Sequence, residues 1–229
     1  WDCLQVTGDI IQQEVDVAPF SKIVIEDDFE LIIRQGASQQ VIVETGANLF
    51  SDIEVTVEDG VIRFKNYNAC NLVREYNVTK AIVTTDTLTE IRNSSAFNVV
   101  SEGVLSFPSL SLVSNTTAGV IDPRKSGDFT LEVDCVNLFV AANGQSGFYI
   151  SGYTENASIG FEDEAPRFEG ANLIIDDLFL VQRSANVMIV NPQDRIRGRI
   201  FGVGDVISLN EPPIVSVEEF FTGRLIFQD

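Results

Sequence analysis

The sequence predicts an all-β protein: a right-handed, single-stranded β-helix (a β-solenoid) preceded by an N-terminal antiparallel β section. Two observations lead to this fold class. In the second half of the chain, a short apolar strand, a small polar segment and another apolar strand recur several times, which is typical of stacked repeats. The first half instead alternates apolar and polar residues around turn signals. The right hand follows from the general preference of crossover connections between parallel strands.

The N-terminal antiparallel section, residues 1–85, contains one strong hairpin signal. Apolar and polar residues alternate in 53–58 and again in 61–65, and Asp59-Gly60 separates the two runs. Alternation buries one face of a strand and exposes the other. Asp-Gly between such runs favours a tight turn in which both residues take positive φ. We therefore expect an antiparallel hairpin here.

A second hairpin is expected earlier in the same section. Residues 29–33 and 41–43 are both apolar at alternate positions, and Gln35-Gly36 lies between them. Glycine supplies the positive φ that tight turns require. Residues 20–65 should therefore form antiparallel strands.

The solenoid section, residues 86–229, carries the repeats, and we expect it to be continuous with the N-terminal section. An irregular step near twenty residues suits one coil of a solenoid. The small polar corners lie at Ser94, Thr116, Gly144, Ser184 and Gly202. The apolar column inside the coils is predicted to contain Leu112, Leu131, Val133, Leu138, Val140, Phe148, Ile174, Phe179, Val187, Ile189 and Ile207. A sandwich of many short strands is the main structural alternative.

Three asparagines precede successive corners of the predicted solenoid. They are Asn93, Asn115 and Asn143. Stacked amides can hydrogen-bond from one strand to the next, so we expect these side chains to form a ladder.

The charge balance is the unusual part of the composition. The chain of 229 residues has 15 basic and 34 acidic residues, a net charge of −19. This excess argues against nucleic acid or an anionic membrane as a partner, because phosphate binding needs clustered Lys and Arg. No apolar run approaches the roughly 20 residues that span a bilayer. No signal peptide is recognisable, and the start at Trp1 is compatible with an export signal that has been removed.

The three cysteines fit neither a zinc spacing nor a Cys-x-x-Cys redox motif. If the protein is exported, the natural arrangement is one disulfide, between Cys3 and Cys70, with Cys135 as a small buried core residue. Three unconnected thiols are the alternative in a reducing compartment.

Catalytic and cofactor motifs are not recognisable in this sequence. Histidine is absent, which excludes Ser-His-Asp and Cys-His systems and the usual zinc sites. The Gly202-Val203-Gly204 segment lacks the helix and the Lys-Ser or Lys-Thr of a nucleotide loop, and is interpreted as a glycine corner. We predict no cofactor and no catalytic residue.

Acidic clusters keep one enzymatic alternative open. They are Asp27-Asp28, Glu162-Asp163-Glu164, Asp176-Asp177 and Glu218-Glu219. Two suitably spaced carboxylates are enough for glycoside hydrolysis. Adjacent aspartates in a strand point to opposite faces, however, so solvated turn residues account for these clusters better. Glu162, Asp163 and Glu164 are weak candidates for a calcium site, because they offer oxygen ligands without EF-hand spacing.

Four aromatic residues cluster in the middle of the chain: Tyr149, Tyr153, Phe161 and Phe168. Aromatic side chains in such a sequence are mostly core or edge-covering residues. The other interpretation is a stacking platform for sugar rings, whose apolar faces aromatic rings can cover. These four are the predicted ligand-binding residues.

Several segments together resemble a known family. In the N-terminal part these are Phe20, Ile23, Ile25, the Leu31–Gly36 segment, Asn48-Leu49 and the Asp59-Gly60 turn into Ile62; in the C-terminal part, the Ile200–Ile207 strand and Pro212–Val215. In these segments, and in its Asp-Cys-Leu start, the chain resembles the putative auto-transporter adhesin, head GIN domain family of exported proteins from Gram-negative bacteria. The family's Gly-Ser-Gly corners are replaced here by Ser94-Ser95-Ala96 and Thr116-Thr117-Ala118. The resemblance implies a β-helical fold, export, frequent lipoprotein anchoring and no known catalytic residues.

The leading functional hypothesis is a non-enzymatic, exported cell-envelope protein, either an outer-membrane lipoprotein or secreted. As an adhesin it would bind a glycan or a surface protein along one face of the solenoid. Two alternatives remain: a carbohydrate-active enzyme with an acidic cleft, and a structural spacer that self-assembles into homo-oligomers through exposed strand edges.

Overall fold

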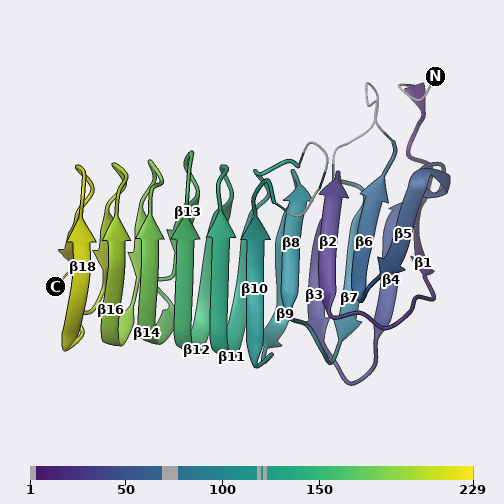
Figure 1. Cartoon of the computed structure of the whole chain (residues 1–229). Coiled ribbons are helices and arrows are strands. Elements are labelled where there is room, and N and C mark those ends of the chain that lie inside the picture. The colour runs from purple at the N-terminus through teal and green to yellow at the C-terminus, as the bar shows by residue number, and fades with distance from the viewer. Residues whose placement is uncertain (1–3, 69–76, 118–119, 121–122, 229) are drawn as a thin grey trace.

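In the residues that it describes, the computed structural model is all-β, with its strands joined in one 19-stranded sheet (Figure 1). The structure describes residues 4–68, 77–117, 120 and 123–228. The N-terminal and middle strands are β1 (Ile10–Glu14), β2 (Lys22–Asp27), β3 (Glu30–Gln35), β4 (Gln40–Gly46), β5 (Ile53–Glu58), β6 (Val61–Asn66), β7 (Lys80–Thr85), β8 (Glu90–Ser95), β9 (Val99–Leu105) and β10 (Ser109–Ser114). The remaining strands are β11 (Phe129–Ala142), β12 (Gly147–Phe161), β13 (Arg167–Glu169), β14 (Leu173–Gln182), β15 (Met188–Val190), β16 (Pro192–Ile200), β17 (Val206–Ser208), β18 (Ile214–Glu219) and β19 (Leu225–Phe227). A short 3-10 turn, η2, covers Phe50–Asp52.

From β8 onward, the chain alternates between two ladders of parallel strands. The first ladder runs β8–β10–β11–β12–β14–β16–β18. The second runs β9–β11–β12–β13–β15–β17–β19. The long strands β11 and β12 belong to both ladders: their first residues pair with β9 and β13, and the remainder pairs with β10 and β14. Figure 1 shows the strands side by side up to β18 at the C-terminal end, which confirms the predicted stacking of short strands.

The Asp59-Gly60 hairpin is confirmed. Strands β5 and β6 pair antiparallel, with Glu58 opposite Val61 at the turn. Asp59 has φ of 50° and Gly60 has φ of 73°. Both turn residues therefore take the left-handed conformation that this turn type requires.

The second predicted hairpin is wrong. Strand β3 pairs in parallel with β7 and β9, whereas β4 pairs antiparallel with β1 and β7. Alternation showed correctly that β3 and β4 are strands, with Leu31, Ile33, Val41 and Val43 buried. It carries no information on which strand is the partner, because any neighbour with an apolar inner face satisfies it. The N-terminal section is consequently a mixed sheet and not an antiparallel one.

Strands β2 and β3 lie inside the ladders although they come early in the sequence. The first ladder continues as β6–β2–β8 and the second as β7–β3–β9, all parallel. Strand β2 therefore lies between β6 and β8, and β3 lies between β7 and β9, although β6 to β9 all come later in the sequence. Hydrogen bonds across this joint tie the N-terminal section to the repeats, and one buried cluster of apolar side chains spans both.

The core lies between the two ladders. The predicted core residues are buried up to Phe148, but not from Ile174 onward. The predicted core residues that are buried are Leu112, Leu131, Val133, Leu138, Val140 and Phe148. Two predicted core residues are wrong, because Ile174 and Phe179 are 39% and 37% exposed. The neighbouring residues Ile175, Leu178 and Leu180 are buried instead. Val187, Ile189 and Ile207 are half-buried, next to the fully buried Met188, Val190 and Val206.

The error at Phe179 arises from a break in alternation where each long strand bends, whereas Ile174 lies before this break and is simply out of phase with the buried Leu173 and Ile175. In β14, Asp176 and Asp177 are both partly exposed, and the register with β16 shifts at the same place. A shift of one residue moves every later side chain to the opposite face. The same break occurs at Val136-Asn137 in β11, where Val136 is 40% exposed. The expectation that the two aspartates point to opposite faces is therefore wrong as well.

The corners at the β8–β9 and β14–β15 turns use the same hydrogen bonds. At the first, Asn93 Oδ1 accepts from the Ser95 amide at 2.9 Å, and its Nδ2 donates to the Phe97 carbonyl at 2.9 Å. Ser95 Oγ accepts from the Phe97 amide at 3.0 Å and donates to the Phe29 carbonyl at 2.8 Å. The serine therefore joins its own turn to the neighbouring turn of the ladder.

In the second corner, Gln182 replaces the asparagine. Its Oε1 accepts from the Ser184 amide at 3.3 Å, and its Nε2 donates to the Asn186 carbonyl at 2.9 Å. Ser184 Oγ accepts from the Asn186 amide at 2.9 Å and donates to the Pro166 carbonyl at 2.7 Å. These four bonds satisfy buried polar groups that would otherwise be costly.

The predicted ladder of asparagine amides is wrong. Asn93 bonds within its own corner, Asn115 Oδ1 accepts from Arg92, and Asn143 Nδ2 donates to Thr116 Oγ1. Asn93 falls beside Ser114 and not Asn115, because β8 and β10 pair Arg92 with Val113. In the described residues, no helix combines the length and apolar character needed to cross a membrane.

Candidate functional site

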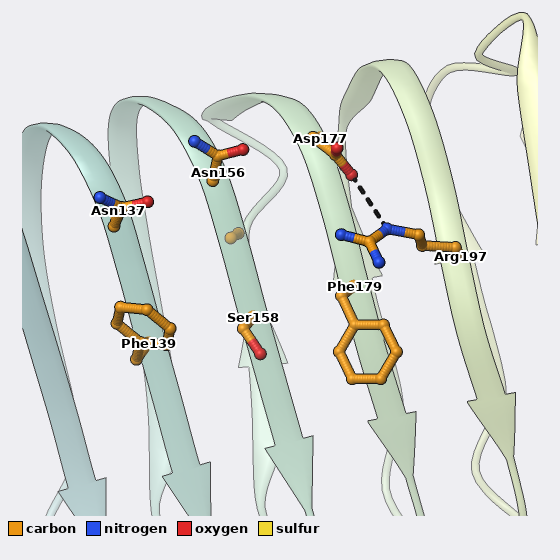
Figure 2. Close-up of a pocket in the computed structure, with 8 residues that line it drawn as sticks. Asn137, Phe139, Asn156, Ser158, Asp177, Phe179 and Arg197 are labelled. Carbon is orange, nitrogen blue, oxygen red and sulfur yellow. Dashed lines mark hydrogen bonds and ion pairs between the residues drawn. The ribbon is translucent and has the colours of Figure 1, made fainter.

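A shallow groove lies on the outer surface of the first ladder, over strands β11, β12, β14 and β16. Parallel pairing in register places residues from successive strands side by side. One row contains Asn137, Asn156, Asp177 and Arg195, and the next contains Phe139, Ser158, Phe179 and Arg197. The groove has a volume of about 450 Å³ and is lined by residues from both rows (Figure 2). This volume falls in the range of about 300–1,000 Å³ that is usual for small-molecule sites.

Two exposed phenylalanines form the walls of the groove. Phe139 is 46% and Phe179 is 37% exposed, and the small side chain of Ser158 lies between them in the row. Phenylalanines two strands apart stand about 10 Å from each other at the usual strand spacing. The hollow therefore exists because a small residue separates two large ones, as Figure 2 shows.

An arginine–aspartate group closes one end of the groove. Arg195 Nε donates to Asp177 Oδ2 at 2.9 Å, and Arg197 Nε donates to Asp177 Oδ1 at 3.4 Å. The hydrogen bonds from Arg195 hold the pKa of Asp177 below its ordinary value. The Arg197 guanidinium also lies over the Phe179 ring, 5.5 Å from its centre, which is the geometry of a cation–π contact.

The groove thus offers apolar faces together with polar groups at its rim. Asn137 and Asn156 line the same edge as Asp177 (Figure 2). The side chain of Arg197 is 49% exposed, so its guanidinium can still reach a ligand. The only carboxylate among the groove-lining residues is Asp177. Such a surface can stack on a ring and hydrogen-bond its substituents, but it lacks the paired carboxylates of a glycosidase.

The four predicted ligand-binding aromatics do not come together. Phe161 and Phe168 are fully buried, so they are core residues and cannot stack on a surface ligand. Tyr149 is 43% exposed, but it belongs to the half of β12 in the second ladder. Tyr153 donates from its hydroxyl to Asp176 Oδ2 at 2.5 Å, and this hydrogen bond raises the pKa of Tyr153 to about 12.

The weak metal candidates lie in the exposed turn after β12. Glu164 Oε1 accepts from Lys125 Nζ at 2.7 Å, and Asp163 Oδ1 accepts from the Glu164 amide at 2.9 Å. Glu162 is exposed beside them. Across the residues that the structure describes, no group of three or more His, Cys, Asp or Glu side chains is arranged to hold a metal ion.

The predicted Cys3–Cys70 disulfide lies outside the described residues. Cys135 is buried with a free thiol, and its sulfur lies 3.5 Å from Thr154 Oγ1. Burial raises the pKa of the Cys135 thiol, which keeps it protonated and unreactive near neutral pH. Its expected role as a small core residue agrees with this position.

Sequence reasoning missed the groove because Phe179 was assigned to the core. A signal for it does exist in the sequence. The polar pairs Glu155-Asn156 and Asp176-Asp177 mark the bends of two successive long strands, and the structure places Val136-Asn137 at the corresponding bend of β11. Aligning the strands on these pairs places Phe139, Ser158 and Phe179 in one outward row.

Comparison with known proteins identifies the family. The family model described as "Putative auto-transporter adhesin, head GIN domain" matches residues 19–212. The chain belongs to this family. No match was found among curated proteins. The family label therefore indicates adhesion without naming what is bound.

Several solved structures share the fold of this chain. A putative adhesin from Bacteroides fragilis superposes with a TM-score of 0.84 at 18% identity, covering 96% of this chain and 97% of that one. A putative adhesin from Parabacteroides distasonis gives 0.70 at 13% identity, covering 96% and 98%. A putative lipid binding protein from the same species gives 0.66 at 13% identity, covering 98% and 99%. At these identities the likeness shows the fold alone.

Proposed function

We propose that this protein is an exported adhesin of the cell envelope that binds a glycan in the groove between Phe139 and Phe179. The observation that carries the proposal is the pair of exposed phenylalanines on either side of Ser158. Exposed aromatic side chains that form a hollow with polar groups at its rim are what ring stacking requires. The apolar face of a sugar would lie on the phenylalanines, and Asn156 and Arg197 would hydrogen-bond its hydroxyl groups.

The rest of the proposal concerns shape and location. The two ladders are proposed to form a right-handed solenoid from 86 to 229, continuous with the section 1–85, because crossover connections between parallel strands strongly prefer that hand. Family membership supports export to the surface of a Gram-negative cell, either as an outer-membrane lipoprotein or in secreted form. A surface protein as the ligand, in place of a glycan, is an outcome that the experiment below distinguishes.

The test is binding of the purified protein to an array of polysaccharides and host matrix proteins, with and without calcium. Phe139→Ala and Phe179→Ala should each weaken glycan binding by about tenfold, the equivalent of about 1.4 kcal/mol. Tyr149→Ala is the matched control, because its side chain is similarly exposed on the second ladder. It should bind as the unchanged protein does.

Four results would overturn the proposal. Loss of binding in Tyr149→Ala but not in the phenylalanine variants would place the site around Tyr149, one of the predicted ligand-binding residues. Binding to matrix proteins alone would replace the glycan by a protein ligand. If the protein bound nothing on the array, the alternative of a structural, self-assembling spacer would be favoured. Breakdown of a bound polysaccharide would instead support the enzymatic alternative.

A further inference from the structure

A row of arginines borders the groove on the side of β16. Arg195, Arg197 and Arg199 occupy alternate positions of this strand, and the residues between them are buried. Alternate residues of a strand point to the same face, so all three arginines project from the outer surface of the first ladder. Arg197 lines the groove, and its guanidinium lies between Asp177 and the Phe179 ring in Figure 2.

The face that carries the groove has the opposite charge to the molecule as a whole. Three rows cross this face from β11 to β16, beginning at Asn137, Phe139 and Ala141. The charged residues in these rows are Asp177 and the three arginines of β16. One acidic and three basic residues give a net charge of +2, although the whole chain has a net charge of −19. Glu218 of β18, which faces Arg199 at 3.2 Å, reduces the local charge to +1.

The other carboxylates near the groove lie at the bends of the long strands. They are Glu155, Asp176 and Asp194, each three residues along its strand from the row that contains Phe139 and Arg197. Three residues of strand span about 10 Å, which is about one Debye length at physiological ionic strength. Salt therefore screens the repulsion from the bends, while an acid group in contact with Arg197 is attracted at close range.

Arg197 has hydrogen-bond donors left for a ligand. An arginine side chain carries five N–H donors. Nε of Arg197 donates to Asp177 Oδ1 at 3.4 Å, whereas Arg195 donates to Oδ2 of the same carboxylate from two of its nitrogens. Within the described part of the chain, no hydrogen bond engages the two terminal nitrogens of Arg197. Two arginines thus share one carboxylate, and the terminal nitrogens of Arg197 can bind an anion.

We infer that the groove takes an acidic glycan, whose carboxylate or sulfate group binds Arg197 while a sugar ring stacks on Phe139 and Phe179. The inference rests on the proposed function and names the class of glycan. The planar guanidinium matches two oxygens of such a group, and charge-assisted bonds are stronger than bonds to a neutral hydroxyl. Arg197 would therefore hold the acid group, and Asn156 would hold a hydroxyl group.

The surrounding acidic surface limits how the charge of the ligand is spaced. Beyond the groove, a regularly charged polyanion would meet the carboxylates that give the chain its net charge of −19. Nucleic acids need clustered basic residues along their whole contact for this reason. The ligand should therefore carry isolated acid groups on an otherwise neutral oligosaccharide.

NMR titration of the full chain with two matched pairs of sugars tests the inference. Sialyllactose and its methyl ester differ by one carboxylate charge, and sulfated lactose and lactose differ by one sulfate. The unchanged protein should bind the acidic member of at least one pair about tenfold more tightly than the neutral member. The pair that shows this preference distinguishes a carboxylate from a sulfate. The amides of β14 and β16 should shift, and added salt should weaken the preference.

Substitution of Arg197 tests which residue recognises the acid group. Arg197→Gln should bind the acidic and neutral members alike, and Arg197→Lys should keep part of the preference because it keeps the charge. Arg34→Gln is the matched control. Arg34 also donates from Nε to a single carboxylate, that of Glu102 at 2.6 Å, but it lies on β3 in the second ladder. This variant removes the same charge from the chain and should keep the full preference, and circular dichroism should show that all variants are folded.

The outcomes separate this inference from the proposed function. Equal affinity for both members of each pair, or a preference that Arg197→Gln leaves intact, would overturn the acidic class. If Phe139→Ala still weakened binding of the neutral sugars, the groove would remain a glycan site of a different class. Failure of all four sugars to bind would also overturn the inference, whereas the array of polysaccharides and matrix proteins decides the proposed function independently.

Discussion

The two corners at Ser95 and Ser184 are built alike but join different parts of the chain. Ser184 reaches the Pro166 carbonyl, 18 residues earlier, in the turn that immediately precedes its own. Ser95 reaches the Phe29 carbonyl, 66 residues earlier, because β2 and β3 occupy the neighbouring place in the ladders. The same local motif therefore serves both a consecutive stack and a joint between distant segments.

The difference shows that local structure and chain order are separate properties of this fold. Closing the longer loop costs about 1 kcal/mol more than closing the shorter one by the logarithmic dependence on length. The bonds that Ser95 and Ser184 make after closure are equivalent. We therefore expect the consecutive stack to form first and the joint at β2 and β3 to follow, since local contacts form faster than distant ones.

The largest expected difference between the N-terminal section and the repeats is in the free energy of unfolding that a glycine substitution costs. Gly198, in β16, has φ of 145°, and a Cβ there would lie 1.9 Å from the Leu180 carbonyl oxygen. Gly198→Ala should cost at least about 3 kcal/mol of unfolding free energy, because it adds a clash to backbone strain. Gly60, in the N-terminal hairpin, has open space around it, so Gly60→Ala should cost only about 1 kcal/mol. Urea unfolding measures both, and equal losses would contradict the close approach of β14 and β16.

Serine substitutions at the two corners should lower the free energy of unfolding equally but change hydrogen exchange in different strands. Ser95→Ala and Ser184→Ala each leave a buried carbonyl without its donor, at a cost of about 1–3 kcal/mol. Urea unfolding should show similar losses for the two variants. Hydrogen exchange should differ: Ser95→Ala should loosen the joint at β2 and β3, and Ser184→Ala should loosen β14 and β15. If Ser95→Ala left exchange at the joint unchanged, its bond to Phe29 would not hold the two segments together.

The smallest expected effect on stability comes from two carboxyl groups, Asp27 and Asp177, whose pKa values are shifted in opposite directions. Burial raises the pKa of Asp27 at the joint above its ordinary 3.8, and the Arg195 hydrogen bonds lower the pKa of Asp177 below 3.8. Asp177 therefore contributes stability that is present above pH 3.8 and is lost as the pH falls through its lowered pKa. Asp27 works in the opposite direction, because its charged form is disfavoured in the folded state. Exposed pairs such as Asp177–Arg195 contribute about 0–1 kcal/mol.

Carbon-detected NMR titration of the two carboxyl groups measures this difference. The midpoint of Asp27 should lie above 3.8 and that of Asp177 below it. Arg195→Gln should raise the Asp177 midpoint and leave Asp27 unchanged. A midpoint for Asp177 at or above 3.8 in the unchanged protein would mean that its arginine contacts do not persist in solution.

Strand positions could be predicted from the sequence wherever the physical signal is local. The Asp59-Gly60 hairpin was found because turn residues and alternation lie within one short segment. The position of β2 and β3 between β6 and β8, and between β7 and β9, could not be found this way. Parallel partners distant in sequence leave no local turn signal, so several arrangements satisfy the same apolar pattern.

The candidate groove was lost through a single phase error. Alternation carried straight from the buried Ile175 through Asp176-Asp177 would reach Phe179, whereas the bend turns Leu178 inward in its place. The prediction that Phe161 and Phe168 could act at the surface failed for a related reason. Both residues follow the inward phase of their strands, and aromatic composition alone does not distinguish a core ring from an exposed one.

The regular rows of the outer surface have an evolutionary consequence. Each turn of the ladders contributes one side chain to each row, as Phe139, Ser158 and Phe179 do. Duplication or loss of a whole turn would therefore lengthen or shorten every row by one residue while leaving the other turns in place. Substitution at one outward position would alter a single wall without touching the core. Proteins that share this fold at only 13% identity could thus have the same framework and different outer rows.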